Sequence, residues 1–435
     1  MNSDFYKVLE EYNSLPKKGY IAEKTISGKT YYYLQYFENG KVVSKYIKKV
    51  GLEAVKKQIE RRKELEKIIK KAQDTAKNLS KPTTNSKNLT GYLMMGDERI
   101  AEIMNGVIVS SKEELLPYLI KRTRNIETFL SSRAIDTGRT NSRLLKKALG
   151  ITENEKSKIA LYAYGASITD NYWFKTKGSK LKYSDISFDN DFYSELALEG
   201  KLSVFPKEAK LTPQLTLGGS YEKCWRKENN EWWLYKKGNE NEIYSELLCS
   251  KLAKKLNIPT AEYEYANNVI KTKNFANNVN YEPVLSIAGD DDSYDNVFNC
   301  LDNISSDLAK SYIKLIWFDS LVNNVDRHNE NCGFLRDRKT GRIIALAPNF
   351  DNNLALISLN ENLNLDVKKD GFIKQFRDFI SNNDKAKQYF FEINFPVLTK
   401  IMIMDCINEI KIKKDNETIV KYLLNRYEIL MNIKN

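Results

Sequence analysis

The sequence has little of the histidine chemistry on which many metal and triad enzymes depend. Its 435 residues include one histidine, His328. A two-histidine zinc site, an HExxH helix and a 2-His-1-carboxylate iron centre are therefore excluded. A nucleophile-His-Asp triad would have to use this one imidazole, and no Gly-x-Ser-x-Gly elbow is present to supply its nucleophile.

Cysteine and long apolar runs are also scarce. No two cysteines form a Cys-x-x-Cys pair, which argues against a disulfide framework or a thiolate zinc site and fits a reducing, cytoplasmic compartment. No apolar run approaches the ~18 residues of a membrane span. The polar first residues (MNSDFYKVLEEYN) are unlike a signal peptide. We therefore expect a soluble intracellular protein with no membrane span. The five cysteines are Cys224, Cys249, Cys300, Cys332 and Cys406.

Positive charge is unevenly distributed along the chain. There are 69 Lys+Arg and 57 Asp+Glu, a formal net charge of +12. Residues 1–90 hold 20 basic and 10 acidic residues, so they carry +10 of this excess. A codon bias toward lysine would act along the whole chain, yet the remainder is nearly neutral. The asymmetry therefore favours an acidic partner for residues 1–90, with nucleic acid the first candidate.

The N-terminal residues have the pattern of a small sheet followed by a helix. Strand-like runs at 20–26, 31–37 and 42–47 are separated by turn signals, the second of which is Asn39-Gly40. Apolar residues then recur at helical spacing from Leu52 to Ile69. Three strands and a helix are similar in pattern to the arm-binding domains of tyrosine recombinases.

Strand-rich segments precede helix-rich ones in the rest of the chain, which predicts an α+β protein with two lobes. Turn-rich and polar stretches mark the expected boundaries. We expect a basic module at 1–75, a linker at 76–89, a strand-rich subdomain at 90–210, strands and a helix of a nucleotide-binding lobe at 211–300, and a helical lobe at 301–435.

The most informative stretch follows an amphipathic helix that ends near Val322. Asp326 and Asn331 stand five residues apart, two apolar runs joined by turn residues then predict a hairpin, and Asp351 follows the returning strand. A hairpin returns the chain close to where it left, so Asp351 should lie near Asn331. One carboxylate to orient a hydroxyl, with an amide and a second carboxylate to hold Mg²⁺ against ATP phosphates, is the set that phosphoryl transfer requires. Loop Asp and Asn are often only turn formers or caps, but the order and spacing of these three favour a kinase.

Residues upstream provide candidates for the nucleotide side. Gly218, Gly219 and Ser220 precede a predicted hairpin, where small residues let backbone amides approach phosphate oxygens. A lysine at the end of the second strand, Lys236, can neutralise phosphates if a carboxylate such as Glu246 positions it. The alternative interpretation gives these residues only structural roles. The glycines then form an ordinary turn, the lysine is exposed to solvent, and the glutamate interacts with the helix dipole.

Two residues of these candidate sites are open to more than one interpretation. Strand alternation favours Lys236 over Lys237, although a twist would reverse the choice. His328 lies in the loop two residues after Asp326, where we expect it to order the loop beside the nucleotide by hydrogen bonding.

The stretch from Thr90 to the C-terminus resembles the HipA-like serine/threonine kinases, closest to a clostridial-type branch described as HipA-domain or phosphatidylinositol-kinase-like proteins. The matching motifs are a glycine-containing loop ending in Glu-Lys, a Glu-Leu-Leu-Cys helix, an Asp-x-His-x-x-Asn loop and an Asp after an apolar-Pro strand. In this sequence they are 218–223, 245–256, 326–331 and 347–351.

The resemblance implies a bilobal protein-kinase-like fold, ATP and Mg²⁺ as cofactors, and transfer to a Ser or Thr hydroxyl of a protein substrate. It also implies a toxin role beside a small DNA-binding antitoxin. Autophosphorylation in the glycine-containing loop is implied too, at Thr216 or alternatively Ser220. Residues 1–89 lie outside the usual family core.

Two alternatives remain open at this point. The Asp-Arg-His sequence at 326–328 is also typical of lipid kinases, so the acceptor could be a lipid or another small hydroxyl compound. The chain could instead be a nucleic-acid-binding regulator with a weak kinase body, although the intact Asp326, Asn331 and Asp351 argue against it.

Overall fold

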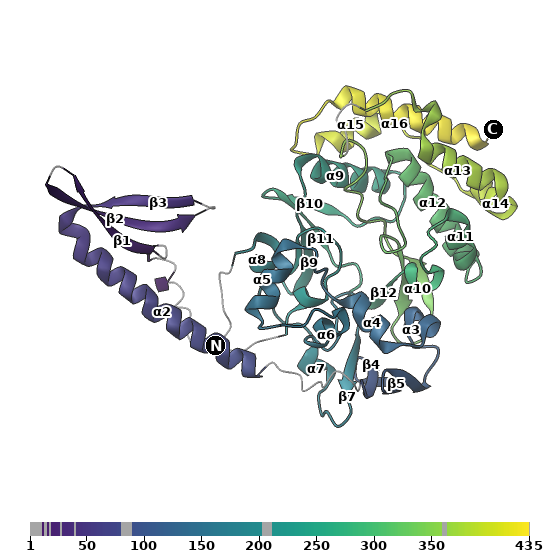
Figure 1. Cartoon of the computed structure of the whole chain (residues 1–435). Helices are drawn as coiled ribbons and strands as arrows, with labels where there is room; N and C mark the ends of the chain where they lie inside the picture. Colours follow the sequence, from purple (N-terminus) through teal and green to yellow (C-terminus); the bar gives the residue numbers. More distant parts are fainter. Residues whose placement is uncertain are drawn as a thin grey trace.

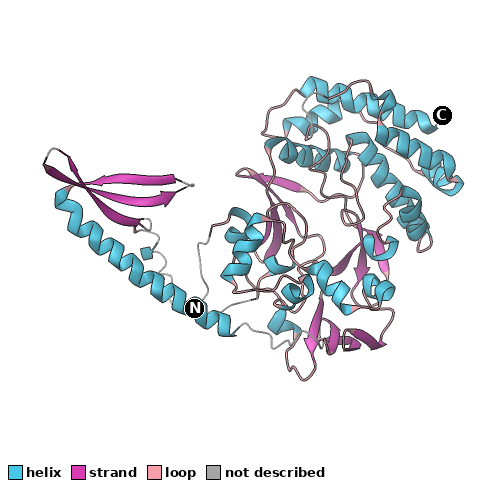
Figure 2. Cartoon of the chain, viewed as in Figure 1, coloured by secondary structure: helices cyan, strands magenta, loops and turns pink. Residues whose placement is uncertain are grey.

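The computed structural model describes residues 11–12, 15–16, 19–26, 28–38, 41–79, 89–201, 211–358 and 363–434. All strands of the described chain lie before residue 347, and the part that follows is helical, as Figures 1 and 2 show. This arrangement confirms the expected α+β class. Among the described residues, no helix is both long and apolar enough to span a membrane.

The N-terminal module is a three-stranded antiparallel sheet with a long helix. Its strands β1 (Gly19–Ile26), β2 (Lys29–Glu38) and β3 (Lys41–Ile47) pair in the order β1-β2-β3 and precede α2 (Leu52–Leu79). One face of the sheet packs against α2 through Leu34, Ile47 and Leu52, which are buried together. The helix continues four residues into the predicted linker at 76–89, and residues 80–88 lie outside the described part of the chain.

A second sheet organises the subdomain predicted at 90–210. It is antiparallel in the order β6-β5-β4-β7, with strands β4 (Gly91–Met95), β5 (Glu98–Met104), β6 (Val107–Ser111) and β7 (Tyr172–Thr176). The first helix of this subdomain begins at Tyr118, directly after Pro117, which stands at its N-cap and lacks an N–H. The helices are α3 (Tyr118–Thr123), α4 (Ile126–Arg133), α5 (Thr140–Ala148), α6 (Lys156–Leu161), α7 (Tyr183–Ile186) and α8 (Ser194–Glu199).

The next sheet and helix form the upper part of the candidate site. Strands β8 (Lys223–Glu228), β9 (Glu231–Lys236), β10 (Tyr263–Ala266) and β11 (Val269–Lys273) pair antiparallel in the order β10-β11-β9-β8. Helix α9 (Glu240–Lys255) begins with a capping box made by Asn239 and Glu242. It starts five residues before the Glu-Leu-Leu-Cys motif at 245–256, because the apolar periodicity becomes regular only after its first turns.

The C-terminal part packs a small sheet against a helical body with one large apolar core. Strands β12 (Val279–Pro283), β13 (Gly333–Asp337) and β14 (Ile343–Leu346) pair in that order, and the β13–β14 hairpin is the predicted one. The helices are α10 (Leu285–Ala288), α11 (Tyr294–Asp302), α12 (Ser306–Val322), α13 (Gly371–Asn382), α14 (Asp384–Glu392), α15 (Lys400–Asn408) and α16 (Asn416–Met431). Short 3-10 turns are η1 (Lys49–Gly51), η2 (Pro213–Thr216), η3 (Val367–Lys369) and η4 (Asn432–Lys434).

Candidate active site

Lys236 lies at the end of β9 with its side chain turned into the protein. Its relative exposure is 4%. The ammonium forms an ion pair with Asp351, donates to Asn353 Oδ1 at 2.9 Å and lies 3.8 Å from Glu246 Oε2. The structure therefore brings together a strand lysine, a helix carboxylate and the carboxylate that follows the hairpin.

Lys237 points elsewhere. Its ammonium pairs with Glu199 of α8 at 2.9 Å and is partly exposed. Adjacent residues of a strand face opposite sides, so only one of the two lysines can reach the buried carboxylates. The geometry selects Lys236 for the buried cluster.

Glu246 is completely buried in the second turn of α9, rather than in the first turn that the sequence pattern predicts. Its Oε1 accepts a hydrogen bond from the Asn352 N–H at 2.8 Å, while its Oε2 has no hydrogen-bond partner among the described residues. Burial raises the pKa of this carboxyl above its ordinary value, and the nearby Lys236 ammonium opposes that rise. Glu246 thus links the lysine strand to the segment around Asp351.

Asp351 occupies the left-handed backbone region with a φ of 62°. Burial alone would raise the pKa of its carboxyl, but the ammonium groups of Lys236 and Lys223 outweigh burial and lower the pKa well below the ordinary value. The carboxylate is therefore ionised, which is the form that a cation site needs. A strained backbone at a buried charge is a feature that clusters at functional sites.

The loop after α12 brings Asp326 and Asn331 into direct contact. The Asn331 side-chain nitrogen donates to the Asp326 backbone oxygen at 3.0 Å and to its carboxylate at 3.2 Å. His328 caps the turn between them, since its Nδ1 accepts from the Glu330 N–H at 3.2 Å and its carbonyl accepts from the Asn331 N–H at 2.9 Å. These contacts are those of a loop-ordering histidine.

The hairpin returns the chain beside this loop, as its turn residues predict. The Ala347 N–H donates to the Gly333 carbonyl at 2.8 Å, and the Leu356 N–H donates to the Val322 carbonyl at 2.9 Å. The segment that carries Asp351 is therefore hydrogen-bonded to both ends of the loop that carries Asp326 and Asn331.

Sequence reasoning missed the side chain that joins these two segments, Arg327. Its guanidinium forms a bidentate ion pair with Asp319, with two contacts of 2.9 Å. It also donates to the carbonyls of Asn331 and Phe350, and the Phe350 contact is 3.0 Å long. Further donor contacts reach Asn349 Oδ1 at 2.7 Å and Asn352 Oδ1 at 3.1 Å.

A sequence signal for Arg327 does exist. Asp319 interrupts the apolar side chains of α12 and is itself buried. A carboxylate in an apolar helix requires a partner, and the arginine eight residues later is the first cation that follows it along the chain. This buried pair fixes the catalytic loop and the Asp351 segment to one helix.

The glycine-containing loop precedes β8. Gly219 has a φ of +87°, and a Cβ there would lie 2.4 Å from Lys223 Nζ, so a larger residue would be strained and would clash. Ser220 is exposed, whereas Thr216 is buried in η2 with its hydroxyl 3.5 Å from the Pro213 carbonyl. The two candidate autophosphorylation residues therefore differ sharply in accessibility.

A second buried lysine lies beside the first. Lys223 is directly opposite Lys236 in the β8–β9 register. Burial lowers the pKa of Lys223 to about 8; the nearby Asp351 partly counteracts this effect, and the positive Lys236 adds to it. Lys223, Lys236 and Gly219 surround a region rich in positive charge, which suits phosphate groups.

The residues present fit a magnesium ion held together with ATP. Because Asp326 engages the amide nitrogen of Asn331, the amide oxygen is left on the other side of the group. That oxygen and the ionised Asp351 are the hard oxygen ligands that Mg²⁺ prefers, with phosphates and waters supplying the rest. Within the described residues no group of three or more His, Cys, Asp or Glu side chains could hold a metal, and a site shared with ATP does not need one.

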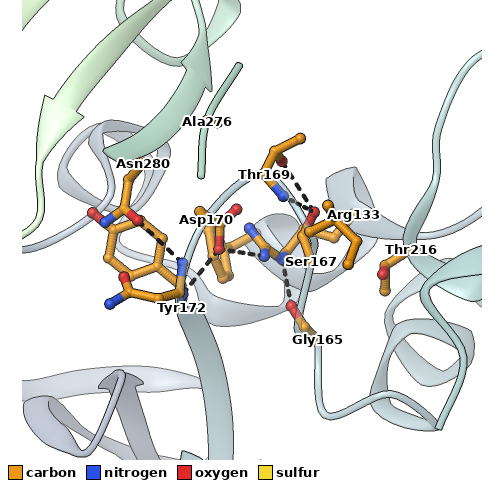
Figure 3. A network of polar contacts seen from close by, with 12 residues as sticks. Arg133, Gly165, Ser167, Thr169, Asp170, Tyr172, Thr216, Ala276 and Asn280 are labelled. Carbon is orange, nitrogen blue, oxygen red and sulfur yellow. Dashed lines mark hydrogen bonds and ion pairs between the residues drawn. The ribbon is translucent and has the colours of Figure 1, made fainter. Parts of the chain in front are cut away.

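A polar network attaches the 90–210 subdomain to the sheet beside the catalytic loop (Figure 3). Arg133 of α4 pairs with Asp170 at 2.7 Å and donates to the Gly165 carbonyl. Asn280 of β12 accepts a hydrogen bond from the Asn171 N–H at 3.1 Å. The loop at 165–171 is therefore held between α4 and β12, and β12 pairs with the strand that follows Asn331.

Comparisons with known proteins agree with this geometry. The family described as the HipA-like C-terminal domain matches residues 208–411, a range that includes every candidate residue named above for the nucleotide and catalytic sites. Residues 208–411 are therefore similar to the HipA-like C-terminal domain, and this match supports a HipA-like kinase family. A second family, described as a domain of unknown function (DUF6788), matches residues 5–57.

One solved structure has a similar fold over most of this chain. HipA of Shewanella oneidensis MR-1, determined with HipB and operator DNA, is 14% identical, with a TM-score of 0.50 over 79% of this chain and 97% of that chain. CtkA, a proinflammatory kinase of Helicobacter pylori, is 21% identical with a TM-score of 0.40, covering 49% of this chain and 92% of that chain. No curated protein matches the chain.

Proposed function

We propose that the chain is an ATP- and Mg²⁺-dependent kinase that phosphorylates a Ser or Thr hydroxyl of a protein. The observation that carries the proposal is the convergence of Lys236, Glu246 and Asp351 on the segment hydrogen-bonded to the Asp326–Asn331 loop. The match of residues 208–411 to the HipA-like C-terminal domain supports it independently.

Each residue of the proposed site has one role. Asp326 orients the acceptor hydroxyl and accepts its proton as the oxygen attacks the γ-phosphorus, and the bond to the β-phosphate oxygen breaks to leave ADP. Lys236 and Lys223 attract the phosphates, while Glu246 keeps Lys236 in place. Asn331 and Asp351 hold Mg²⁺, which neutralises phosphate charge when it is bound.

The ion pair between Lys236 and Asp351 is a resting arrangement in this proposal. With no nucleotide bound, the ammonium and the carboxylate neutralise each other inside the protein. ATP with Mg²⁺ offers each of them a new partner of opposite charge, so binding exchanges one set of charge pairs for another. Burial of unpaired charge is thereby avoided in both states.

A lipid or small-molecule acceptor is the second candidate. The Asp-Arg-His sequence suggested it, but the Arg327 side chain is directed to Asp319 and to the Asp351 segment. Its contacts explain the arginine through loop architecture and leave the acceptor class to the experiment below.

Autophosphorylation in the glycine-containing loop belongs to the proposal as well. Ser220 is exposed and can be modified in the described conformation, whereas Thr216 must first leave its buried position. Modification of Thr216 would therefore trap the loop outside the site, because a phosphate cannot return to a buried apolar position.

The partner proposed for this kinase is a small DNA-binding antitoxin. HipA of Shewanella oneidensis MR-1 forms a complex with HipB and operator DNA. We carry this partner class to the present chain as a proposal of a toxin role. Co-purification of a small protein that suppresses ATP turnover would support this partner. Unaltered ATP turnover in the presence of that protein would contradict it.

The kinase proposal is tested by incubating the full chain with ATP and Mg²⁺, with and without cell lysate, followed by mass spectrometry. Wild type should consume ATP and place phosphate on protein, whereas Asp326→Ala and Asp351→Ala should not. Asp378→Ala, which removes an exposed carboxylate of α13, is the matched control and should behave like wild type. Equal ATP consumption by all four proteins would refute the proposal, and phosphate found on a small molecule would identify the second acceptor class.

A second candidate function concerns residues 1–90. Their charge of +10 favours nucleic-acid binding, which would target the kinase to a polyanion. Full-length protein should then bind oligonucleotides with an affinity that falls as salt rises. Salt-independent binding, or none, would contradict this function without affecting the kinase proposal.

A further inference from the structure

The three-stranded sheet of the N-terminal module has one covered face and one open face. The covered face packs Leu34 and Ile47 against α2. On the open face the register places Lys24 opposite Tyr31, Tyr33 opposite Tyr46, and Tyr20 opposite Gln35. Directly paired residues share a face, so one side of the sheet collects four tyrosines. We call this side the tyrosine face, defined by Tyr20, Lys24, Tyr31, Tyr33 and Tyr46.

The rings of the tyrosine face are accessible. Tyr20 is 63% exposed and Tyr46 is 53% exposed, although apolar or aromatic side chains of this size usually find cover. The Tyr46 ring lies 5.7 Å from that of Tyr33 and 6.3 Å from that of Tyr31, so the rings form a continuous group. A contiguous aromatic patch on a small module marks a binding surface.

The charge of this face is positive and unpaired. Lys24 lies 5.3 Å from the Tyr33 ring, and Lys29 begins β2 on the same side. The described residues of the three strands place no carboxylate on this face, and Glu23 is on the opposite one. In the described part of the chain no ion pair involves the sheet-side lysines, which are Lys24, Lys29, Lys45, Lys48 and Lys49.

Helix α2 differs from the sheet because several of its charged side chains form ion pairs. Five described carboxylates form ion pairs with basic residues of α2, so the helix neutralises part of its own charge. The segments 19–49 and 52–79 each carry a net charge of +4, but only in the helix do described ion pairs engage the basic side chains. The pairs of α2 are Lys56–Glu53, Arg61–Glu11, Arg61–Glu64, Arg62–Glu66 and Lys63–Glu60.

We propose that the tyrosine face binds single-stranded nucleic acid, with bases stacked on the tyrosine rings and phosphates drawn to the lysines. Every base has a π-face, so exposed rings beside cations form a sequence-tolerant platform. A duplex keeps its bases stacked inside and offers only groove edges and phosphates, which would leave the rings without a function. The proposal rests on the nucleic-acid function of residues 1–90 and adds the surface and the form of the ligand.

The test measures fluorescence anisotropy of labelled oligonucleotides of about 16 nucleotides with the full chain. The probes are oligothymidylate, oligouridylate and a mixed-sequence duplex, at salt between about 50 mM and 200 mM. Both single strands should bind more tightly than the duplex, with affinity falling as salt rises. Tighter binding of the duplex would overturn the proposal.

Variants separate stacking from general charge. Tyr46→Thr should weaken single-strand binding about tenfold, because a stacking ring is lost, whereas Tyr46→Phe should stay within about twofold. Lys24→Gln should lower the salt slope by about one unit. Lys57→Gln removes the same charge from an exposed position of α2 and should leave binding unchanged.

Other outcomes are decisive too. If Tyr46→Thr does not fold, as judged by circular dichroism, Tyr20→Thr at the edge strand replaces it. Wild-type binding by the folded tyrosine variant, or equal losses for Lys24→Gln and Lys57→Gln, would overturn the proposal. The proposal would also be overturned if the wild type bound no oligonucleotide and formed a dimer that the tyrosine variant abolished, because the tyrosine face would then be a protein interface. ATP turnover of these variants should match wild type, so failure here is distinct from failure of the kinase proposal.

Discussion

Charged side chains have opposite environments in the N-terminal module and in the HipA-like domain. In the candidate site of the domain they are largely buried and paired in networks, such as Lys236 with Asp351 and Arg327 with Asp319. In the module they lie on the surface, where α2 pairs its own charges and the sheet leaves Lys24 without an ion pair among the described residues.

The difference indicates that buried and exposed charges have different functions in this chain. A buried charge must be fully partnered, so its removal harms the fold and the chemistry together. An exposed charge is screened and costs little to change, so it acts through long-range attraction and graded binding. Changes in the domain should therefore be large and local to the site, and changes in the module should be small and dependent on salt.

The largest effect is expected from Lys236→Met. The substitution leaves Asp351 without its cationic partner and places Glu246 next to an uncompensated carboxylate. We expect loss of ATP turnover by at least about a hundredfold and a loss of roughly 3–5 kcal/mol in unfolding free energy. Turnover assays and denaturant titration measure the two effects.

Lys237→Met is the matched control for this change. It removes the neighbouring lysine, whose partner Glu199 is part-exposed, so stability should change by less than about 1 kcal/mol. Similar losses of ATP turnover and unfolding free energy in both variants would mean that the buried cluster has no special role. The contrast between the two regions would then be wrong.

The next largest effect is expected from Arg327→Lys. Lysine keeps the charge but cannot form the bidentate pair with Asp319 while reaching the carbonyls of Asn331 and Phe350. We expect kcat to fall by more than about tenfold, and stability to fall by roughly 2–3 kcal/mol, because several hydrogen bonds to a charged group are lost.

Arg336→Lys tests whether this loss of activity is only a loss of stability. Arg336 is equally buried and pairs with Glu282, but its other contacts reach the 114–116 segment and the hairpin turn instead of the catalytic loop. It should destabilise the protein by a similar amount while kcat per folded molecule is kept. A parallel fall of kcat in both variants would remove the positioning role of Arg327.

The sequence predicts local features of this site and fails at the connections between distant segments. Asp326, Asn331, Asp351 and the hairpin follow from spacing and turn residues within one short stretch. The α+β class follows from the order of strand-like and helix-like patterns. Strands β10 to β12 were not expected, since their short runs of mixed residues lack a clear alternation.

Long-range contacts explain what pattern analysis could not supply. The partner of Arg327 is determined by packing of α12 against two loops, and neither periodicity nor turn chemistry encodes that packing. The burial of Thr216 likewise depends on surrounding elements, so the sequence alone could not show that Thr216 is covered while its alternative, Ser220, is exposed.

A pH-dependent effect on stability is expected from Lys223→Met. The folded pKa of Lys223 is about 8 against an ordinary value of 10.5, so the unfolded chain binds the proton more tightly between these two values. Charged Lys223 thus destabilises the fold below pH 8, and this cost disappears as pH rises toward 10.5. At one pKa unit per 1.36 kcal/mol, the variant should be more stable than wild type by roughly 3 kcal/mol at neutral pH.

Melting temperatures from neutral pH to about pH 10 measure this prediction, since the gap between the two proteins should close over the range in which the folded lysine loses its proton. A constant gap for Lys223→Met would mean that this lysine is compensated by other charges in solution.

The smallest effect is expected from Arg61→Gln. This variant tests whether a positive charge on the helix contributes to oligonucleotide binding as much as a positive charge on the sheet. Arg61 pairs with Glu11 and Glu64 on the surface of α2, so at physiological salt its loss should leave the melting temperature unchanged. The substitution lowers the net charge by one unit, as Lys24→Gln does.

However, the helix lies behind the sheet, about 10 Å from the tyrosine face, and the Debye length at that salt is about 8 Å. The salt slope of oligonucleotide binding should therefore respond to Lys24→Gln and hardly to Arg61→Gln. Equal responses would show that the total charge of the module drives binding, in which case its sheet and helix would not differ in function.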